Sequence, residues 1–552
     1  MKKKEYKKYK GVQGVQDNGS RRGNVLHSLF SMHSLALLIT LAFIVAEAYA
    51  LWYKGDASVG LIPLALLVVW LFVARLETGL LLMALLTPFA VNMALFPGME
   101  LSMPVEPMMI LFTFIFLFRV LLSRSYDLRI LRHPMSLLLL ASLAWMAFTS
   151  ATSEMPWVSI KYTLARVWFV TPFFFAATHF FKEQKRIRQF FWAYAIGLGV
   201  VILIATSKTL GNFSDLQTLH RVMRPFYNDH TAYGCVIALM IPAAVYFVIM
   251  GVQGVRSARE SKDNSTVNGN VLHSFALLAL LALLALLALL LIGLFFSYCR
   301  AAWISVVGAI GVYVLIRMGM KVKWMVLLFG LGVGAFFVYQ SDVLYKLGKN
   351  KQDSSYTLAD QVKSISNIST DASNLERLNR WASAFRMWEE RPVLGCGPGT
   401  YQFLYASYQR SYQLSTISTN AGNLGNAHSE YIGPLTEQGV PGVALVALLF
   451  LTTFATGVRV YRTATDPHTA RMALAFTLSL LTYYIHGVFN NFLDTDKLSV
   501  PFWGFTAVIV ALDVYSEKHN KSIPNEKTRT ISGTPTDLGS HTDSPVAPDI
   551  QG

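Results

Sequence analysis

Charged residues are scarce in this chain of 552 residues: Asp, Glu, Lys and Arg make up 14% of it, while 53% of the residues are hydrophobic. A soluble domain carries about 25% charged residues, so this balance excludes an ordinary soluble protein. Cysteine is scarce too. The three cysteines, Cys235, Cys299 and Cys396, show no paired spacing, which excludes a disulfide framework and a Cys-x-x-Cys zinc site.

Long apolar runs recur instead, each of about 16–22 residues, which is enough for a helix to cross a bilayer. We therefore expect an all-α polytopic membrane protein with about 12–14 transmembrane helices. The expected spans are 33–52, 59–74, 78–96, 107–122, 135–150, 166–181, 189–207, 231–250, 274–296, 301–317, 323–340, 440–458, 470–489 and 499–515. A large loop, 341–439, separates the first eleven spans (33–340) from the last three (440–515).

Basic residues gather after every second expected span, for example in the stretches 182–188 and 256–262. Cytoplasmic loops of membrane proteins carry this excess of Lys and Arg. The alternation predicts that both termini are cytoplasmic and that the 341–439 loop is external. It also accounts for the net charge of +15, so nucleic acid is not expected as a partner.

The two ends of the chain are polar. We expect residues 1–32, which begin MKKKEYKKYK, to be a basic cytoplasmic segment rather than a cleavable signal peptide, and residues 516–552 to be a disordered tail. GVQGV and GNVLHS each occur twice, at 11–15 and 23–28 and again at 251–255 and 269–274. Both copies fall in expected cytoplasmic segments, and we interpret them as a duplicated linker.

Several arginines lie on the expected outer side, although Lys and Arg otherwise concentrate in the expected cytoplasmic connections. Arg300 stands in the short connection CRAAW, and the segment HRVMRPFYNDHTAYG (220–234) contains Arg221, Arg224 and Asn228. Charges at the border of a membrane are costly and are candidates for function. The alternatives are a snorkelling anchor for Arg300 and a helix-capping loop for 220–234.

The external loop contains one segment with helical periodicity, SNLERLNRWASAFRMWEE (373–390). Its apolar residues fall on one face: Leu375, Leu378, Trp381, Phe385 and Trp388. We expect an amphipathic helix that lies along the membrane surface or over a cavity, with Arg380 on another face.

The segment NAHSEYIGPLTEQGVPG (426–442) joins this loop to the next span. The pKa of a histidine lies near neutrality, so His428 is a candidate general base, and Glu430 is placed to orient its imidazole. Gly439 and Gly442 would let the following helix pack closely against a neighbour. A base and several cations on one outer face suggest a phosphorylated donor and a hydroxyl nucleophile.

These motifs resemble the O-antigen ligase and O-antigen polymerase superfamily over about residues 160–510. HSEYIGPLTEQGVPG is similar to its His-Ser, Gly-x-x-Gly pattern, with His428, Ser429, Gly439 and Gly442 at the matching positions. RPFYNDHTAYG is similar to its Arg-aromatic-Asn segment, although the family often has Asn-Pro-Asn where this chain has Asn228-Asp229-His230. CRAAW and RWASAFRMWEERPVLGCGPGTYQF resemble its short arginine turn and its loop helix.

The resemblance implies a glycosyltransferase at the periplasmic face of a bacterial inner membrane. Its donor would be a glycan on undecaprenyl pyrophosphate, delivered within the membrane lipid, and its acceptor a hydroxyl on lipid A-core, on another glycan or on a protein. His428 and Glu430 would be catalytic. The pyrophosphate would be bound by Arg300, Arg224, Arg221 and Arg380. Transfer would invert the anomeric carbon and need no metal or cofactor.

Three alternatives to a ligase stay open at this point. An O-antigen or capsule polymerase and a protein O-oligosaccharyltransferase would share the fold and the donor. A multipass transporter would need polar groups at mid-membrane and two related halves, whereas the polar candidates here gather at one face. Asp494 and Asp496 form an Asp-x-Asp pair, which resembles a glycosyltransferase metal site, but we interpret this common pair as a solvated loop.

The predicted topology is testable with reporter fusions. A reporter fused after Lys351 should be active only in an external compartment, and one fused after Ser516 only in the cytoplasm, because the basic connections orient the chain. Cytoplasmic activity of the first fusion would overturn the site assignment, since His428 and Arg300 could not then meet an exported donor.

Overall fold

The computed structural model describes residues 45–46, 49, 61–96, 99–123, 126–211, 221–263, 267–328, 330–331, 372–415, 418 and 425–515. The predictions for 1–32, for most of spans 33–52 and 323–340, for the first part of the external loop and for the tail lie outside these residues. The described part is mostly helical, with one two-stranded antiparallel sheet. The expected all-α fold is confirmed.

Eight helices among the described residues are long and apolar enough to cross a membrane. They are α4 (Val105–Ser123), α6 (Pro134–Ala151), α9 (Gln184–Leu210), α11 (His230–Asp263), α12 (Val267–Phe296), α13 (Arg300–Arg317), α18 (Ile432–Thr463) and α20 (Asp496–Tyr515). The other α-helices are α2 (Leu61–Ala74), α3 (Leu76–Leu86), α5 (Leu128–Arg132), α7 (Pro156–Val170), α8 (Ala177–Phe180), α16 (Ala372–Glu390), α17 (Tyr401–Leu404) and α19 (Pro467–His486). The protein is a multi-pass membrane protein.

The prediction of one helical span over 78–96 is wrong in its second half. Helix α3 ends at Leu86, a 3₁₀ turn (Thr87–Phe89) contains Pro88, and the chain then forms β1 (Val91–Phe96), which pairs with β2 (Met99–Met103). Proline ends the helix because it lacks the N–H that the ladder needs. A short apolar run does not distinguish strand from helix, which is why the sequence pattern missed the hairpin.

Two other spans differ at their N-terminal ends. The helical run expected at 166–181 begins at Pro156 and passes through a π-helical turn (Thr171–Ala176) into α8. The span expected at 440–458 begins at Ile432, so Gly439 and Gly442 lie inside α18 rather than at its start. Proline at the first turn of α7 and a serine before α18 favour these earlier starts.

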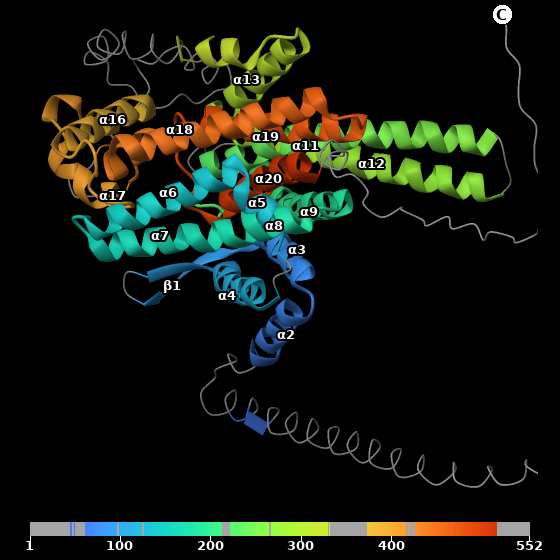
Figure 1. The fold of residues 1–552 in the computed structure, drawn as a ribbon, viewed down its shortest axis with the longest axis horizontal. Helices are drawn as coiled ribbons and strands as arrows, with labels where there is room; N and C mark the ends of the chain where they lie inside the picture. The colour runs from blue at the N-terminus through green and yellow to red at the C-terminus, as the bar shows by residue number, and fades with distance from the viewer. Residues whose placement is uncertain are drawn as a thin grey trace, which may run out of the picture.

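Helix α20 lies at the centre of the bundle. In its most apolar stretch 89% of the residues are buried inside the protein, against 17% in α12. Helices α11 and α12 form a long antiparallel hairpin (Figure 1), and α12 exposes many leucines. This contrast is expected if α12 faces lipid while α20 is enclosed by protein.

Helix α16 confirms the amphipathic helix expected in the external loop. Its apolar face, with Leu378 and Trp381, packs against Tyr401, Tyr405 and Ile432. Figure 1 shows α16 and α17 at the end of the bundle where α18 begins. The helix therefore covers the start of α18 and the segment that carries His428.

The loop after α16 is bonded to the first turns of α18. The N–H of Gly397 donates to the carbonyl of Glu437 (2.8 Å), and the N–H of Val440 donates to the carbonyl of Pro392 (2.9 Å). Gly439 interrupts the helix with φ 69°, and a Cβ there would lie 2.1 Å from the carbonyl oxygen of Val393. The close approach expected of Gly439 is thus made by loop backbone and not by a neighbouring span.

Replacement of Gly439 should destabilise the protein. Gly439→Ala places a side chain in the left-handed region and against the Val393 carbonyl, which costs roughly 1–3 kcal/mol. Gly311→Ala is the matched control, because nothing lies within 4 Å of a Cβ at that helical position. Thermal unfolding of the detergent-solubilised variants compares them, and equal melting temperatures would contradict the assigned kink.

Candidate functional site

His428 has a strained backbone. Its φ is 50°, and Tyr298, two residues before Arg300, has φ 49°; these are the non-glycine residues with positive φ in the described part of the chain. Such conformations are costly for bulky residues and cluster at functional sites. Both occur beside residues that the sequence singled out.

Local hydrogen bonds hold the segment around His428. The backbone N–H of His428 donates to Oδ1 of Asn426 (3.1 Å). Ser429 is buried, and its hydroxyl accepts from the backbone N–H groups of Tyr431 and Ile432, each at 3.3 Å. Ser429 therefore starts α18 rather than facing a substrate.

Arg380 is buried in an ion pair. Its Nε donates to Oε1 of Glu376 (2.8 Å) and its Nη1 donates to the carbonyl of Asn426 (3.0 Å). The guanidinium also lies 4.9 Å from the centre of the Tyr405 ring, and a Cβ at Gly425 would lie 1.8 Å from Nη1. Arg380 thus holds the 425–426 backbone, and its expected binding of pyrophosphate stays a prediction.

The surroundings of His428 keep its ring neutral. Burial, together with the charges of Arg377 and Arg380, lowers the pKa of His428 from 6.5 to about 3, and a side-chain hydrogen bond with Asn490 opposes that shift. Cations and loss of solvent both disfavour imidazolium. The ring is therefore neutral at pH 7, and the same surroundings make it a weak base in this state.

Glu430 does not have the partner expected of it. Its Oε1 accepts from the N–H groups of Phe492 and Leu493, both at 2.9 Å, and from the hydroxyl of Tyr483. Asn490 is the residue bonded to His428, and its Nδ2 also lies 3.1 Å from Nε2 of His486. Glu430 thus anchors the segment that carries Asn490 and reaches the imidazole only indirectly.

The remaining predicted cations lie at the N-terminal ends of α11 and α13. Arg300 is the first residue of α13 and is half-buried, whereas Arg221 and Arg224 are exposed. Nε of Arg224 donates to the carbonyl of Asn228 (3.2 Å), and Asn228 is itself exposed. A Cβ at Gly234 would lie 2.7 Å from Cβ of Cys299, so the start of α11 packs against the turn before Arg300.

Arg377 lies where its charge acts on both the His428 segment and the turn before Arg300. Its Nε donates to the carbonyl of Phe489 (3.1 Å), and its charge acts on the pKa of both His428 and Cys299. The sequence pattern offers little reason to choose Arg377 over its neighbours on the loop helix, apart from its place one turn before Arg380. Asn490, in the stretch FNNF, carried no signal at all.

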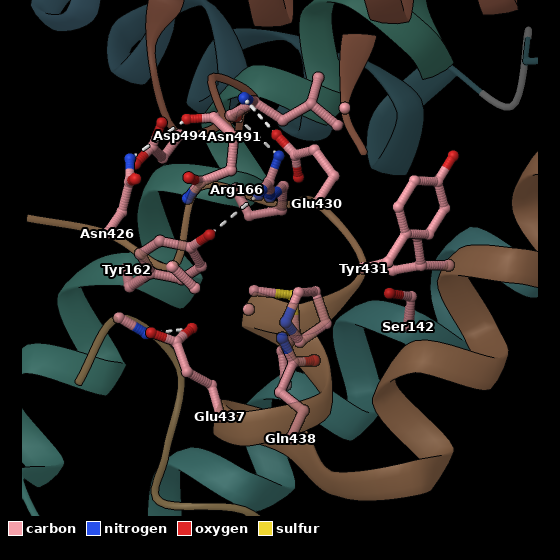
Figure 2. Close-up of a pocket in the computed structure, with 18 of the residues that line it drawn as sticks. Ser142, Tyr162, Arg166, Asn426, Glu430, Tyr431, Glu437, Gln438, Asn491 and Asp494 are labelled. Carbon is pink, nitrogen blue, oxygen red and sulfur yellow. Dashed lines mark hydrogen bonds between the residues drawn. The ribbon is translucent and has the colours of Figure 1, made fainter. Parts of the chain in front are cut away.

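A cavity of about 210 Å³ lies between α6, α7, α18 and the start of α20 (Figure 2). Asn426, Ala427 and Glu430 line it, but His428 does not. The segment that carries His428 therefore forms part of the cavity wall.

One charged group of the cavity belongs to the Asp-x-Asp pair. Asp494 lines the cavity and is exposed, and the protein packed around it, with the charge of Glu430, raises its pKa to about 6. Asp496 is buried elsewhere, between Nζ of Lys497 (3.0 Å) and the hydroxyl of Ser102 (2.8 Å). The exposed Asp494 agrees with the solvated loop expected for this pair, whereas Asp496 is buried, so the two carboxylates have different surroundings.

The sequence profile of the family described as O-Antigen ligase matches residues 284–447. This stretch contains Arg300, the α16 helix, His428 and the Gly439 kink. A search among curated proteins finds no match.

The ion pair of Arg380 gives a prediction about the stability of the loop. Arg380→Ala should lower the free energy of unfolding by about 3–5 kcal/mol, because it leaves the buried Glu376 carboxylate without its partner. Replacing both residues by leucine should restore part of this loss. Chemical denaturation of the purified variants measures it; an Arg380→Ala protein as stable as the wild type would show that the pair does not hold the loop.

Proposed function

We propose, since residues 284–447 belong to the O-antigen ligase superfamily, that this protein is a ligase-type glycosyltransferase. It moves a glycan from undecaprenyl pyrophosphate to an acceptor hydroxyl, in the first place on lipid A-core, at the periplasmic face of a bacterial inner membrane. The observation that carries the proposal is the neutral, strained His428 held beside Arg377 and Asn490.

The donor pyrophosphate binds at the outer end of α13 in this proposal. Arg300 supplies a guanidinium that can bind phosphate oxygens in a bidentate way, and it stands at the N-terminus of an 18-residue helix, where unpaired N–H groups favour anions. Arg377 lies toward His428, and the exposed Arg221 and Arg224 line the approach. These arginines stabilise the charge that develops on the leaving pyrophosphate.

In this proposal, donor binding also raises the pKa of His428. The charge of Arg377 lowers the pKa of His428 in the free protein. An anion bound beside Arg377 offsets that charge, so the pKa of His428 rises toward its ordinary value. The imidazole then becomes a stronger base only when a donor is present.

The proposed transfer step uses His428, the arginines and the two substrates. The acceptor hydroxyl oxygen attacks the anomeric carbon, its proton passes to His428, and the bond from that carbon to the pyrophosphate oxygen breaks. Attack opposite the leaving group inverts the anomeric centre. Polyprenyl pyrophosphate is a good leaving group, so we propose that neither a metal ion nor a cofactor takes part.

The acceptor distinguishes ligase from the related activities. A polymerase would use the end of another lipid-linked glycan, and a protein O-oligosaccharyltransferase a serine or threonine hydroxyl, with the same donor and base. A transporter function fits the structure less well than a glycosyltransferase, because the candidate polar side chains lie at one end of the bundle rather than at mid-membrane.

Two substitutions separate base catalysis from donor binding. His428→Ala should lower the transfer rate by roughly 10²–10⁴, the usual contribution of a general base, while donor binding persists. Arg300→Ala should weaken donor binding, and Arg300→Lys should restore it only in part, because ammonium lacks the guanidinium fork. The assay uses purified protein with a polyprenyl-pyrophosphate glycan and measures binding and transfer separately.

His273→Ala is the control, since that residue lies on α12 about 35 Å along the helix from Phe296. Transfer should also survive EDTA. A folded His428→Ala protein with near-normal transfer would refute the proposal, and loss of turnover in EDTA, restored by magnesium, would refute metal independence.

A further inference from the structure

The segment that carries His428 runs antiparallel to the chain that follows α19. Nδ2 of Asn426 donates to the carbonyl of Asn491 (3.4 Å), and the N–H of Glu430 donates to the carbonyl of Gly487 (2.8 Å). His428 is midway between these two bonds, so it lies opposite the middle of that chain. The pairing fixes which side chains after α19 can reach the imidazole.

One of them, Asn490, contacts two imidazoles. Its side chain is hydrogen-bonded to His428, and its Nδ2 lies 3.1 Å from Nε2 of His486. His486 is the last residue of α19, and both it and Asn490 are buried, at 0% and 2% exposed. An amide has a donor at one end and an acceptor at the other, so it can bond both rings at once. The proposed reaction leaves His486 without a role.

The two ends of the amide set the protonation of both rings. An amide nitrogen only donates, so Nε2 of His486 accepts, and the proton of that ring is on Nδ1. Oδ1 of Asn490 then faces His428. Because that oxygen only accepts, the nearer ring nitrogen of His428 carries the proton. The other nitrogen of His428 keeps a free lone pair for the acceptor hydroxyl.

The reverse orientation of the amide would disable His428. If Nδ2 of Asn490 faced this ring, the nearer nitrogen would have to accept from it. The proton of the neutral imidazole would then occupy the other nitrogen, which has to receive the proton of the acceptor hydroxyl. A ring at position 486 whose Nε2 accepts excludes that orientation.

Packing alone does not account for a histidine at position 486. Nδ1 of His486 is buried and has no hydrogen-bond partner within the described part of the chain. Leaving a buried donor unpaired is costly, and an apolar side chain at this helix end would avoid that cost. What the histidine supplies here is Nε2, the acceptor for the amide of Asn490.

We propose that His486 is a positioning residue, which fixes the orientation of the Asn490 amide and, through it, the tautomer in which His428 can act as a base. The inference rests on the proposed function for the role of His428. His486 acts only through the amide and not on a substrate.

Leucine and glutamine at position 486 form a matched pair of variants. They are similar in size, but Oε1 of glutamine can accept from Nδ2 of Asn490 and leucine cannot. His486→Leu should let the amide rotate and lower kcat by about threefold to tenfold, the effect of one hydrogen bond, with little change in KM for the donor. His486→Gln should recover most of that loss. Asn490→Leu removes both contacts and should lower kcat by roughly a hundredfold, toward the loss of the base itself.

Asn490→Asp tests the bond to His428 through the pH profile. A carboxylate beside the ring stabilises imidazolium, so the pKa of His428 should rise. Transfer needs the unprotonated ring, so the acidic limb of kcat against pH should move up by about one to three pH units. Arg377 and Arg380 on α16, and Asp229 before α11, are the charged groups that act on the two rings, and they are unchanged in this variant. An unmoved limb would overturn the proposal.

Nitrogen-15 NMR of histidine-labelled protein in detergent reads the tautomer without any substrate. Protonated and unprotonated ring nitrogens have well-separated chemical shifts, and the spectrum of His428→Ala assigns the signals. The wild type and His486→Gln should show His428 as a single tautomer, and His486→Leu should show an average of two. An averaged signal in the wild type, or the same single tautomer in His486→Leu, would contradict the proposed role of His486.

The two readouts separate this inference from the proposed function. If His486→Leu transfers as fast as the wild type while His428→Ala does not, the role of His486 is refuted and the base remains. If the tautomer of His428 depends on His486 but transfer does not depend on His428, the amide link stands and the proposed function falls. Equal melting temperatures of His486→Leu and His486→Gln exclude a folding defect, and if His486→Leu is unstable, the pH profile of Asn490→Asp decides.

Discussion

The docking of the 392–401 loop on the start of α18 is the constraint on which the site depends. The carboxylate of Glu437 accepts from the N–H groups of Gly399 (2.9 Å) and Tyr401 (3.1 Å), while loop and helix backbones bond to each other on either side of the Gly439 kink. A helix interrupted after its second turn would otherwise leave N–H and C=O groups unpaired near the membrane, at considerable cost. The loop satisfies those groups, and in doing so it fixes α16 above the first residues of α18.

With α16 in place, its arginines reach the segment before α18. Arg380 holds the carbonyl of Asn426 from one side, and the N–H groups of Phe492 and Leu493 hold Glu430 from the other. His428 lies between these two anchors in the left-handed conformation. Its strain is thus maintained by contacts with two separate elements, which explains how a bulky residue keeps that conformation.

The same segment divides two electrostatic environments. On the His428 side, Arg377 and Arg380 act on the imidazole. On the cavity side, Glu430 and Asp494 dominate, and the pKa of Asp494 is raised. The two sides of the segment therefore differ in charge.

The sequence by itself determined the membrane class, most of the helical spans, the amphipathic loop helix and the place of His428 at the border of a span. Hydrophobic runs and helical periodicity are local properties, so a linear pattern reveals them. It could not reveal the partners of Glu430, the ion pair of Arg380, or the roles of Arg377 and Asn490. These depend on contacts between α16, α18 and the 486–494 segment, which lie far apart in the chain, and the direction of a side chain is decided only when those elements pack.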